Sequence, residues 1–151
     1  MKNILMSFWP SVYDRISSQS KLIEFRSRFP DEETVVYMYV SKPCKSIKGI
    51  VKLGRRIDMS TVASDSSFYR QAEHYGYKPE KYVYGMPICS FQETTSLSLK
   101  EIKADFPRFA APQSYIILDN NPKLLEFIKS RIKATGPCLE NNHITHEDII
   151  C

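Results

Sequence analysis

The segment Thr34-Val-Val-Tyr-Met-Tyr-Val40 determines how the neighbouring parts of the chain must be arranged. It is rich in β-branched and aromatic residues, which favour an extended backbone. Apolar side chains stand at both odd and even positions, and in a strand these positions point to opposite faces. Both faces therefore need a covering layer, and the segment is predicted to be a central strand.

Further strands and helices are predicted on both sides of this segment. In the strands, apolar residues alternate with polar ones or form short runs between turn residues; they cover residues 4–8, 22–29, 46–58, 86–94 and 114–118. In the helices, apolar residues recur three or four positions apart; they cover residues 11–17, 65–75, 79–84, 97–104 and 122–133. Ser64 or Asp65 is expected to cap the second of these helices, and Gly85 to end the third.

Strands and helices do not alternate regularly along the chain, which argues against a doubly wound parallel sheet. The predicted fold class is α+β, with a small, mixed but mainly antiparallel β-barrel and flanking helices. A length of 151 residues suits one domain. We assign residues 3–133 to this domain and residues 134–151 to a C-terminal tail.

Charge is distributed unevenly along the chain. The sequence has 21 Lys and Arg against 17 Asp and Glu, a net charge of +4. Residues 1–59 contain 11 basic and 6 acidic side chains and carry a net charge of +5, whereas residues 60–151 contain 10 and 11 and carry −1. A basic first half favours a polyanionic partner such as a nucleic acid.

The sequence predicts a cytoplasmic protein without a cofactor. Its first residues form too short an apolar run for a signal peptide, and no run approaches the ~20 apolar residues of a membrane span. The four cysteines include no C-x-x-C pair, and phosphate-loop, dinucleotide-binding and catalytic-serine motifs are absent. His143-x-x-His146-Glu-Asp148 has metal-binding residue types, but no third ligand cluster accompanies it. We interpret these residues as surface residues and predict no metal site.

One candidate for function is the segment Lys21-Leu-Ile-Glu-Phe-Arg-Ser-Arg28. A two-residue repeat places Glu24, Arg26 and Arg28 on one face of a strand, with Lys21 at its start. A carboxylate between cations holds them rigidly, which suits a cleft that binds an anion or the edge of a base. A solvated strand face with cross-strand pairing explains the same pattern.

A second candidate is a basic strand without an acidic residue between Glu33 and Asp58. Its cations are Lys42, Lys45, Lys48, Lys52, Arg55 and Arg56. Such a row could follow a phosphate backbone, or it could be an edge strand that lysines protect against aggregation. Trp9 and the tyrosines could provide a stacking platform for bases, although packing in the core explains most of them.

Three separated segments carry a resemblance to a known family. Residues 4–26, 36–49 and 111–115 resemble, in this order, the ASCH family of the PUA-like superfamily, in the branch described as PUA-like predicted transcriptional regulators. The resemblance extends over residues 3–118. It implies a small β-barrel with flanking helices, a cleft at one end of the barrel, and a role in binding RNA or modified nucleobases.

The resemblance also implies which residues line the cleft. Lys21, Glu24 and Arg26 fall on the family's Lys-x-x-[Glu/Thr]-x-Arg segment, and Trp9 is expected at the rim. Ser41 follows the next strand, and Gln113 with Ser114 would line the other side. The expected partner is RNA or a modified nucleoside or nucleotide.

Enzymatic activity is a second implication, and it is not carried over. One ASCH branch removes an acyl group from acetylated cytidine with a lysine, a threonine three residues later and a glutamate. In this chain Lys21 matches the lysine, but Glu24 stands at the threonine position and removes the nucleophile. The predicted function is therefore a binding module with a regulatory role. The alternatives are an amidohydrolase-like or ribonuclease-like hydrolase, and an interaction protein that docks through residues 122–133.

Overall fold

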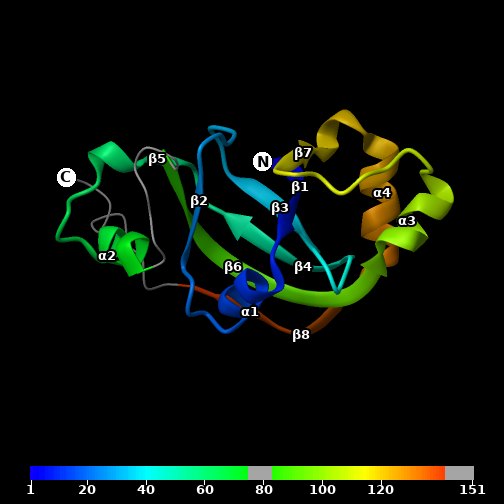
Figure 1. Cartoon of the computed structure of the whole chain (residues 1–151), viewed down its shortest axis with the longest axis horizontal. Helices are drawn as coiled ribbons and strands as arrows, with labels where there is room; N and C mark the ends of the chain where they lie inside the picture. Colours follow the sequence, from blue (N-terminus) through cyan, green and yellow to red (C-terminus); the bar gives the residue numbers. More distant parts are fainter. Residues whose placement is uncertain (75–82, 142–151) are drawn as a thin grey trace.

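The computed structural model describes residues 1–74 and 83–141. In this part of the chain one curled sheet forms a half-barrel, with the strand order β2-β6-β4-β3-β1-β7 and with β5 and β8 paired to β6 (Figure 1). The strands are β1 (Lys2–Phe8), β2 (Ile23–Arg26), β3 (Thr34–Val40), β4 (Ser46–Leu53), β5 (Ile57–Asp58), β6 (Tyr84–Ser98), β7 (Tyr115–Ile117) and β8 (Ala134–Glu140).

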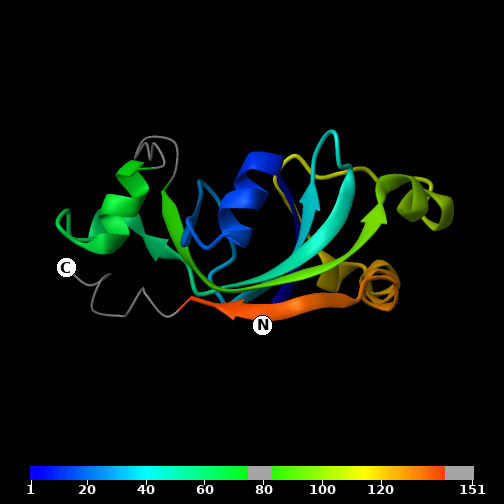
Figure 2. The same ribbon diagram turned by 90° about the horizontal axis from the view of Figure 1, so that it is seen from below.

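Helices flank the sheet on one face and at both ends of the molecule. They are α1 (Pro10–Ser17), α2 (Ser67–His74), α3 (Leu99–Asp105) and α4 (Pro122–Arg131), with the short 3₁₀ turns η1 (Met59–Thr61) and η2 (Leu118–Asn120). Figure 2 shows α1 against one face of the sheet, α2 at one end and α3 with α4 at the other. Among the described strands, β1 and β3 pair in parallel and the other pairs are antiparallel. The predicted α+β class and mixed, mainly antiparallel sheet are confirmed.

β3 is the buried centre of the sheet, as its sequence predicts. It lies between β1 and β4, and its residues alternate between two apolar clusters. Val36, Met38 and Val40 belong to the first cluster, which includes Tyr13 of α1. Tyr37 and Tyr39 belong to the second cluster, which α3 and α4 cover. Both faces of β3 are therefore covered.

β6 runs through most of the sheet and pairs with four strands. Its first residues pair with β2 and β5, and the rest pairs with β4 and β8. Gly85 lies between β2 and β5, where a Cβ atom would stand 2.8 Å from the sulfur of Met59 and 2.9 Å from Cζ of Phe68. A side chain at residue 85 would therefore force these neighbours apart.

Several predicted boundaries are wrong. The long strand expected over residues 46–58 breaks at Gly54 into β4 and β5. The helix expected over residues 79–84 is wrong at its end, because Tyr84 and Gly85 begin β6. Residues 75–82 lie outside the described part. Ser66 rather than Ser64 or Asp65 caps α2, because its Oγ accepts a hydrogen bond from the backbone N–H of Tyr69 at 3.1 Å.

Two further expectations change because of strand pairing. Residues 134–140, expected to begin a tail, form β8 and pair with β6, so this segment is part of the sheet. The basic strand is not an edge strand, since β4 pairs with β3 on one side and β6 on the other. Leu124 and Ile128 of α4 are buried in the second cluster, which removes them from the docking face considered for residues 122–133.

No helix in the described ranges is both long enough and apolar enough to cross a membrane.

Candidate ligand-binding site

Three of the predicted site residues form a buried charged cluster. The ammonium nitrogen of Lys21 lies 3.9 Å from Oε1 of Glu24, and Nε of Arg26 lies 3.7 Å from the same oxygen. The side chains of Lys21 and Glu24 are only 9% and 8% exposed, and that of Arg26 is 20% exposed. Two cations and one carboxylate therefore share a site that is largely removed from water.

The packing of β2 explains why this cluster is buried rather than solvated. Ile23 and Phe25 pack into a third apolar cluster with Phe68 of α2. Glu24 points to the opposite face, where its cross-strand partner Met86 belongs to the first apolar cluster. Both faces of β2 are thus covered. The solvated strand face is the wrong interpretation for Glu24, which is 6% exposed.

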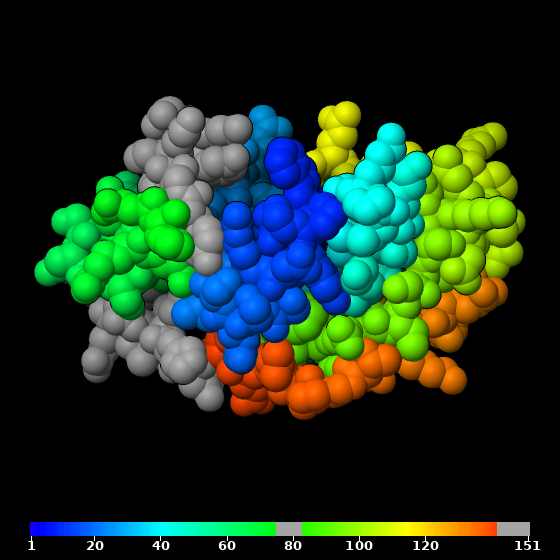
Figure 3. Space-filling model, turned by 60° about the horizontal axis from the view of Figure 1, so that its bottom comes forward, coloured from blue at the N-terminus to red at the C-terminus, as the bar shows by residue number. Residues whose placement is uncertain are grey.

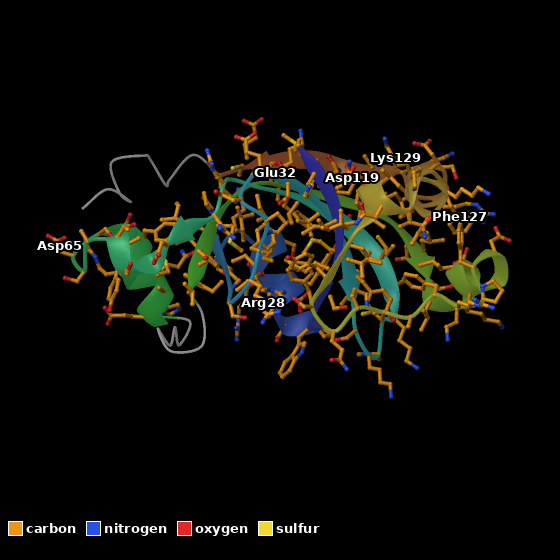
Figure 4. The ribbon with its side chains drawn as sticks, turned by 90° about the horizontal axis from the view of Figure 1, so that it is seen from above. Arg28, Glu32, Asp65, Asp119, Phe127 and Lys129 are labelled. Carbon is orange, nitrogen blue, oxygen red and sulfur yellow. The ribbon has the colours of Figure 1, made fainter. Side chains whose placement is uncertain are left out.

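Arg28 does not belong to the cluster, although the two-residue repeat places it on the same face. β2 ends at Arg26, and Arg28 is exposed in the turn that follows. Figure 4 shows Arg28 in the middle part of the molecule, between Asp65 beside α2 and Phe127 on α4. The face defined by the sequence pattern therefore stops two residues earlier than predicted.

One oxygen of the buried carboxylate has no hydrogen-bond partner among the described residues. Oε1 of Glu24 accepts a hydrogen bond from the backbone N–H of Phe25 at 3.2 Å, whereas Oε2 is buried and accepts none from this part of the chain. Buried polar atoms nearly always have a partner, because an unmade hydrogen bond to a charged group costs several kcal/mol (about 1–3 or more). Oε2 is therefore an acceptor whose hydrogen-bonding capacity is not used by the described residues.

The end of β1 is the point at which the other segments meet the cluster. The carbonyl oxygen of Ser7 accepts a hydrogen bond from Nη2 of Arg26 at 3.3 Å. The carbonyl oxygen of Phe8 accepts two, from the backbone N–H of Ser41 at 2.9 Å and from its hydroxyl at 3.3 Å. The carbonyl of Ser114 accepts from the N–H of Ser7 at 3.3 Å. Ser114 thus contacts Ser7, the residue that also accepts from Arg26, and Ser41 contacts the next residue, Phe8.

Trp9 and Gln113 are the two remaining residues that the sequence predicted. Trp9 directly follows β1, precedes α1 and is 74% exposed. Gln113 is exposed and neighbours Ser114. The structure places both on segments that surround the end of β1, but it gives neither a hydrogen bond with the charged cluster.

Sequence reasoning missed the backbone groups of the site and, outside the charged cluster, the hydrogen bond of one buried tyrosine. The carbonyls of Ser7 and Phe8 organise the site, and a backbone group has no signature in the sequence. The hydroxyl of Tyr13 donates to the carbonyl of Lys48 at 2.9 Å. Burial, followed by the nearby charge of Glu93, raises the pKa of Tyr13 to about 12. The only available signal for Tyr13 was its position on the apolar side of α1.

Metal-binding residues do not gather in the part of the chain that the structure describes. There, no three His, Cys, Asp or Glu side chains are grouped closely enough to hold a metal ion. His143, His146, Glu147 and Asp148 lie outside the described residues. A hollow of about 530 Å³ between α3 and α4 is lined by Phe106, Phe109, Leu124 and their neighbours and includes none of the predicted site residues.

Comparison with known proteins finds similarity in structure but not in sequence. No family model matches the sequence, and no curated protein matches it. The crystal structure of ASCH from Zymomonas mobilis superposes with a TM-score of 0.65 at 22% identity, over 87% of this chain and 96% of that one. A tyrosine-to-phenylalanine variant and a serine-to-alanine variant of the same protein each match with a TM-score of 0.65 at 21% identity. They cover 88% and 87% of this chain, and 100% and 97% of their own.

Proposed function

The chain has the ASCH fold, and on that basis we propose that it binds RNA or a modified nucleobase at the cluster of Lys21, Glu24 and Arg26. The observation that carries this proposal is the carboxylate of Glu24: its Oε1 lies near two cations, and its buried Oε2 has no hydrogen-bond partner among the described residues. An arrangement of this kind costs stability, and a bound ligand would complete it.

The chemistry of the cluster favours a base over a simple anion. Lys21 and Arg26 donate hydrogen bonds only, and the ionised Glu24 only accepts them. A phosphate alone would be attracted by the two cations but repelled by the carboxylate between them. A nucleobase edge offers both kinds of group: its carbonyl or ring nitrogen accepts from Lys21 or Arg26, and its amino or imino group donates to Glu24.

The neighbouring residues fit the same ligand. Trp9 presents an exposed indole beside the end of β1, and aromatic side chains stack well on unpaired bases. Ser41, Gln113 and Ser114 add hydroxyl and amide groups around the same strand end. We place Trp9, Ser41, Gln113 and Ser114 at the rim and the charged cluster at the bottom of the site. A module of this kind acts by binding alone, as a regulator does.

One observation favours the hydrolase as a second candidate. A lysine acting as a base needs a pocket closed to water and a nearby group that positions it. Lys21 is buried and lies 3.9 Å from Glu24. An activity assay distinguishes the two candidates. A hydrolase converts a modified nucleoside or cleaves RNA, and Lys21→Met abolishes that activity.

The binding proposal is tested by removing the two cations. We expect Lys21→Met/Arg26→Met to weaken binding of short RNA about 10–100-fold, the effect of losing a charge-assisted hydrogen bond worth about 1.5–3 kcal/mol. Fluorescence anisotropy with labelled RNA measures this affinity. The control Lys129→Met/Arg131→Met removes the same two residue types from the exposed face of α4 and should bind normally.

Glu24→Gln gives an independent readout. The carboxamide keeps the size of the side chain but replaces an acceptor-only group by one that also donates. We therefore expect weaker binding of the base and stronger binding of inorganic phosphate, measured by calorimetry. Unchanged RNA affinity in the double cation variant would refute the proposed site, and product formation by the native chain would favour the hydrolase.

A further inference from the structure

The structure divides the six cations of the basic strand into two groups. Arg55 lies 2.9 Å from Asp31, and Arg56 donates to the carbonyl of Phe29 and stacks on Tyr84, so both arginines are already engaged in contacts within the protein. Lys52 pairs with Val35, which packs against the second apolar cluster. Lys48 instead lies over the ring of Tyr13 in the first cluster, because a bulge between Ile47 and Gly49 interrupts the alternation.

The segment that carries Lys42, Lys45 and Lys48 lies beside α3, which carries Lys100 and Lys103. The backbone N–H of Leu99 donates to the carbonyl of Lys45 at 2.8 Å, which fixes the segment 41–45 against the start of α3. In Figure 3 the segment around residue 45 (cyan) lies between α1 (blue) and α3 (yellow-green) on one face of the molecule. We call this surface the lysine ridge; it consists of Lys42, Lys45, Lys48, Lys100 and Lys103.

Glu93 and Asp14 lie near Tyr13, over whose ring Lys48 lies, but the ridge lysines form no ion pair in the described part of the chain. No carboxylate of the described residues lies within 4.0 Å of any of these five ammonium groups, since the ion pairs in this part of the chain involve other cations. On α3, Glu101 is engaged in a capping box with Ser98, and Asp105 pairs with Arg131 at 3.6 Å. The segment 42–48 contains no acidic residue.

The ridge begins where the proposed binding site ends. β1 and β3 are parallel, and Phe8 pairs with Val40, so Trp9 and Ser41 leave the sheet at the same end. Arg26 contacts the carbonyl of Ser7, and Ser41 contacts that of Phe8. A path along the surface therefore leads from Arg26 past Trp9 to Lys42, and from there over Lys45 to α3.

We infer that the lysine ridge binds the phosphates of a single-stranded oligonucleotide, one base of which enters the charged cluster. This inference rests on the proposed function and narrows its ligand from any nucleoside to a polynucleotide. Lysines act as point charges that suit phosphates without reading sequence. A base can reach a buried cluster or stack on Trp9 only when it is unpaired, which favours a single strand over a duplex.

The test compares two charge-matched variants of the full chain. The ridge variant is Lys42→Gln/Lys45→Gln/Lys100→Gln/Lys103→Gln, and the control is Lys52→Gln/Lys123→Gln/Lys129→Gln/Lys133→Gln. All eight lysines are exposed, so both variants should keep the thermal unfolding of the native chain. Affinity is measured by anisotropy across a salt series, from a mononucleotide to strands of about 12 nucleotides, within the range of single-strand sites.

We expect the ridge variant to bind the longer strands at least about tenfold more weakly and to leave mononucleotide binding unchanged. Its slope of log affinity on log salt should become shallower by about 0.7 for each phosphate that the protein no longer neutralises. The control should show neither change.

Three outcomes would overturn the inference: equal losses of affinity in both variants, native binding that does not tighten with strand length, or equally tight binding of duplex. Each of them leaves the proposed base site standing. The reverse result, in which Lys21→Met/Arg26→Met leaves binding intact and the ridge variant abolishes it, would contradict the proposed site and support the ridge.

Discussion

Glu24 combines deep burial with an incomplete set of hydrogen bonds, and the two cations beside it do not make this arrangement stabilising overall. Removing a carboxylate and two cations from water costs several kcal/mol per ion, and their mutual attraction repays this cost only with excellent geometry. The separations of 3.7 and 3.9 Å are at the long end for ion pairs. The proposed function accounts for these residues by binding rather than by stability.

If the cluster does not stabilise the fold, a single and a triple substitution within it should have opposite effects on the free energy of unfolding. Glu24→Leu leaves Lys21 and Arg26 buried without their carboxylate, and we expect it to lower the free energy of unfolding by about 3–5 kcal/mol. Lys21→Met/Glu24→Leu/Arg26→Met removes all three charges and should be at least as stable as the native chain while losing RNA binding. Urea unfolding and anisotropy measure the two properties. A triple variant less stable than Glu24→Leu would show that the cluster holds the fold together.

Tyr13 gives a prediction about alkaline pH. Burial, with smaller contributions from the charges of Glu93, Asp14 and Cys44, raises its pKa from 10.0 to about 12. The folded state thus keeps the phenol protonated after the unfolded state has ionised. The contribution of Tyr13 to stability is complete below pH 10 and is lost between pH 10 and about 12, by as much as roughly 2–3 kcal/mol.

The variant Tyr13→Phe tests whether Tyr13 causes this loss of stability at alkaline pH. It lacks the ionisable group and the hydrogen bond to the carbonyl of Lys48, so it should be about 1 kcal/mol less stable at pH 7. Its stability should then fall less than that of the native chain between pH 10 and 12. Burial raises the pKa of Tyr37 and Tyr39 as well, and these residues account for the loss that remains. Parallel curves for the two proteins would refute the assignment to Tyr13.

At the scale of elements, the sequence identifies those segments whose local chemistry and packing agree. β3 spans the predicted residues 34–40, and α1 begins at Pro10, whose missing N–H suits a first helical turn. α4 begins at Pro122, after Asn121 has accepted a hydrogen bond from the N–H of Leu124. In each of these elements the residue that ends or caps the segment lies next to its apolar pattern, so a short window of sequence contains the whole signal.

β6 and β8 show what the sequence could not predict. The strand expected over residues 86–94 forms the middle of β6, but Tyr84 and Gly85 were missed, because glycine disfavours a strand locally and pairing with β2 and β5 overrides that preference. β8 contains Gly136 and Pro137 and is mostly exposed, so it has no apolar alternation. The burial of the charged cluster could not be predicted either: the pattern of residues 21–28 predicts its members, but the burial of Glu24 depends on its distant cross-strand partner Met86.

The pairing of β8 predicts that the chain cannot be shortened at residue 133. Gln92 donates to the carbonyls of Thr135 and Gly136, and Asn141 donates to those of Cys89 and Ile88. Removing residues 134–151 should expose this edge of β6, lower the thermal unfolding midpoint and promote aggregation. A chain that ends after Asn141 keeps every one of these contacts and is the control. Equal midpoints and equal elution on size exclusion would show that β8 adds nothing to the sheet.

At the scale of the whole molecule, the half-barrel is open between the two ends of its strand order, β2 and β7. Among the described residues, few contacts cross this opening. Arg26 donates to the carbonyl of Ser7, and the rings of Phe29 and Tyr115 meet edge to face with centroids 5.7 Å apart. The proposed site lies at this opening, because an edge of the sheet that is not closed by pairing leaves polar groups for a ligand.

The opening between β2 and β7 predicts where a ligand changes the dynamics of the protein. Segments held by few contacts open at a lower free energy than the centre of a sheet, so the amides of β2 should exchange with solvent faster than those of β3 and β4. RNA that contacts both sides should slow exchange in residues 21–26, 41–45 and 110–114, by up to the RT ln(1 + [L]/Kd) that binding contributes. Exchange in β3 should be unchanged, since β3 is already paired on both sides. Hydrogen exchange followed by mass spectrometry, with and without RNA, measures all of these segments together. Lys21→Met/Glu24→Leu/Arg26→Met, which removes all three charges, is the control that is expected to fold without binding. Slower hydrogen exchange confined to α4 or spread evenly over the sheet would place the ligand elsewhere and contradict a site at the opening between β2 and β7.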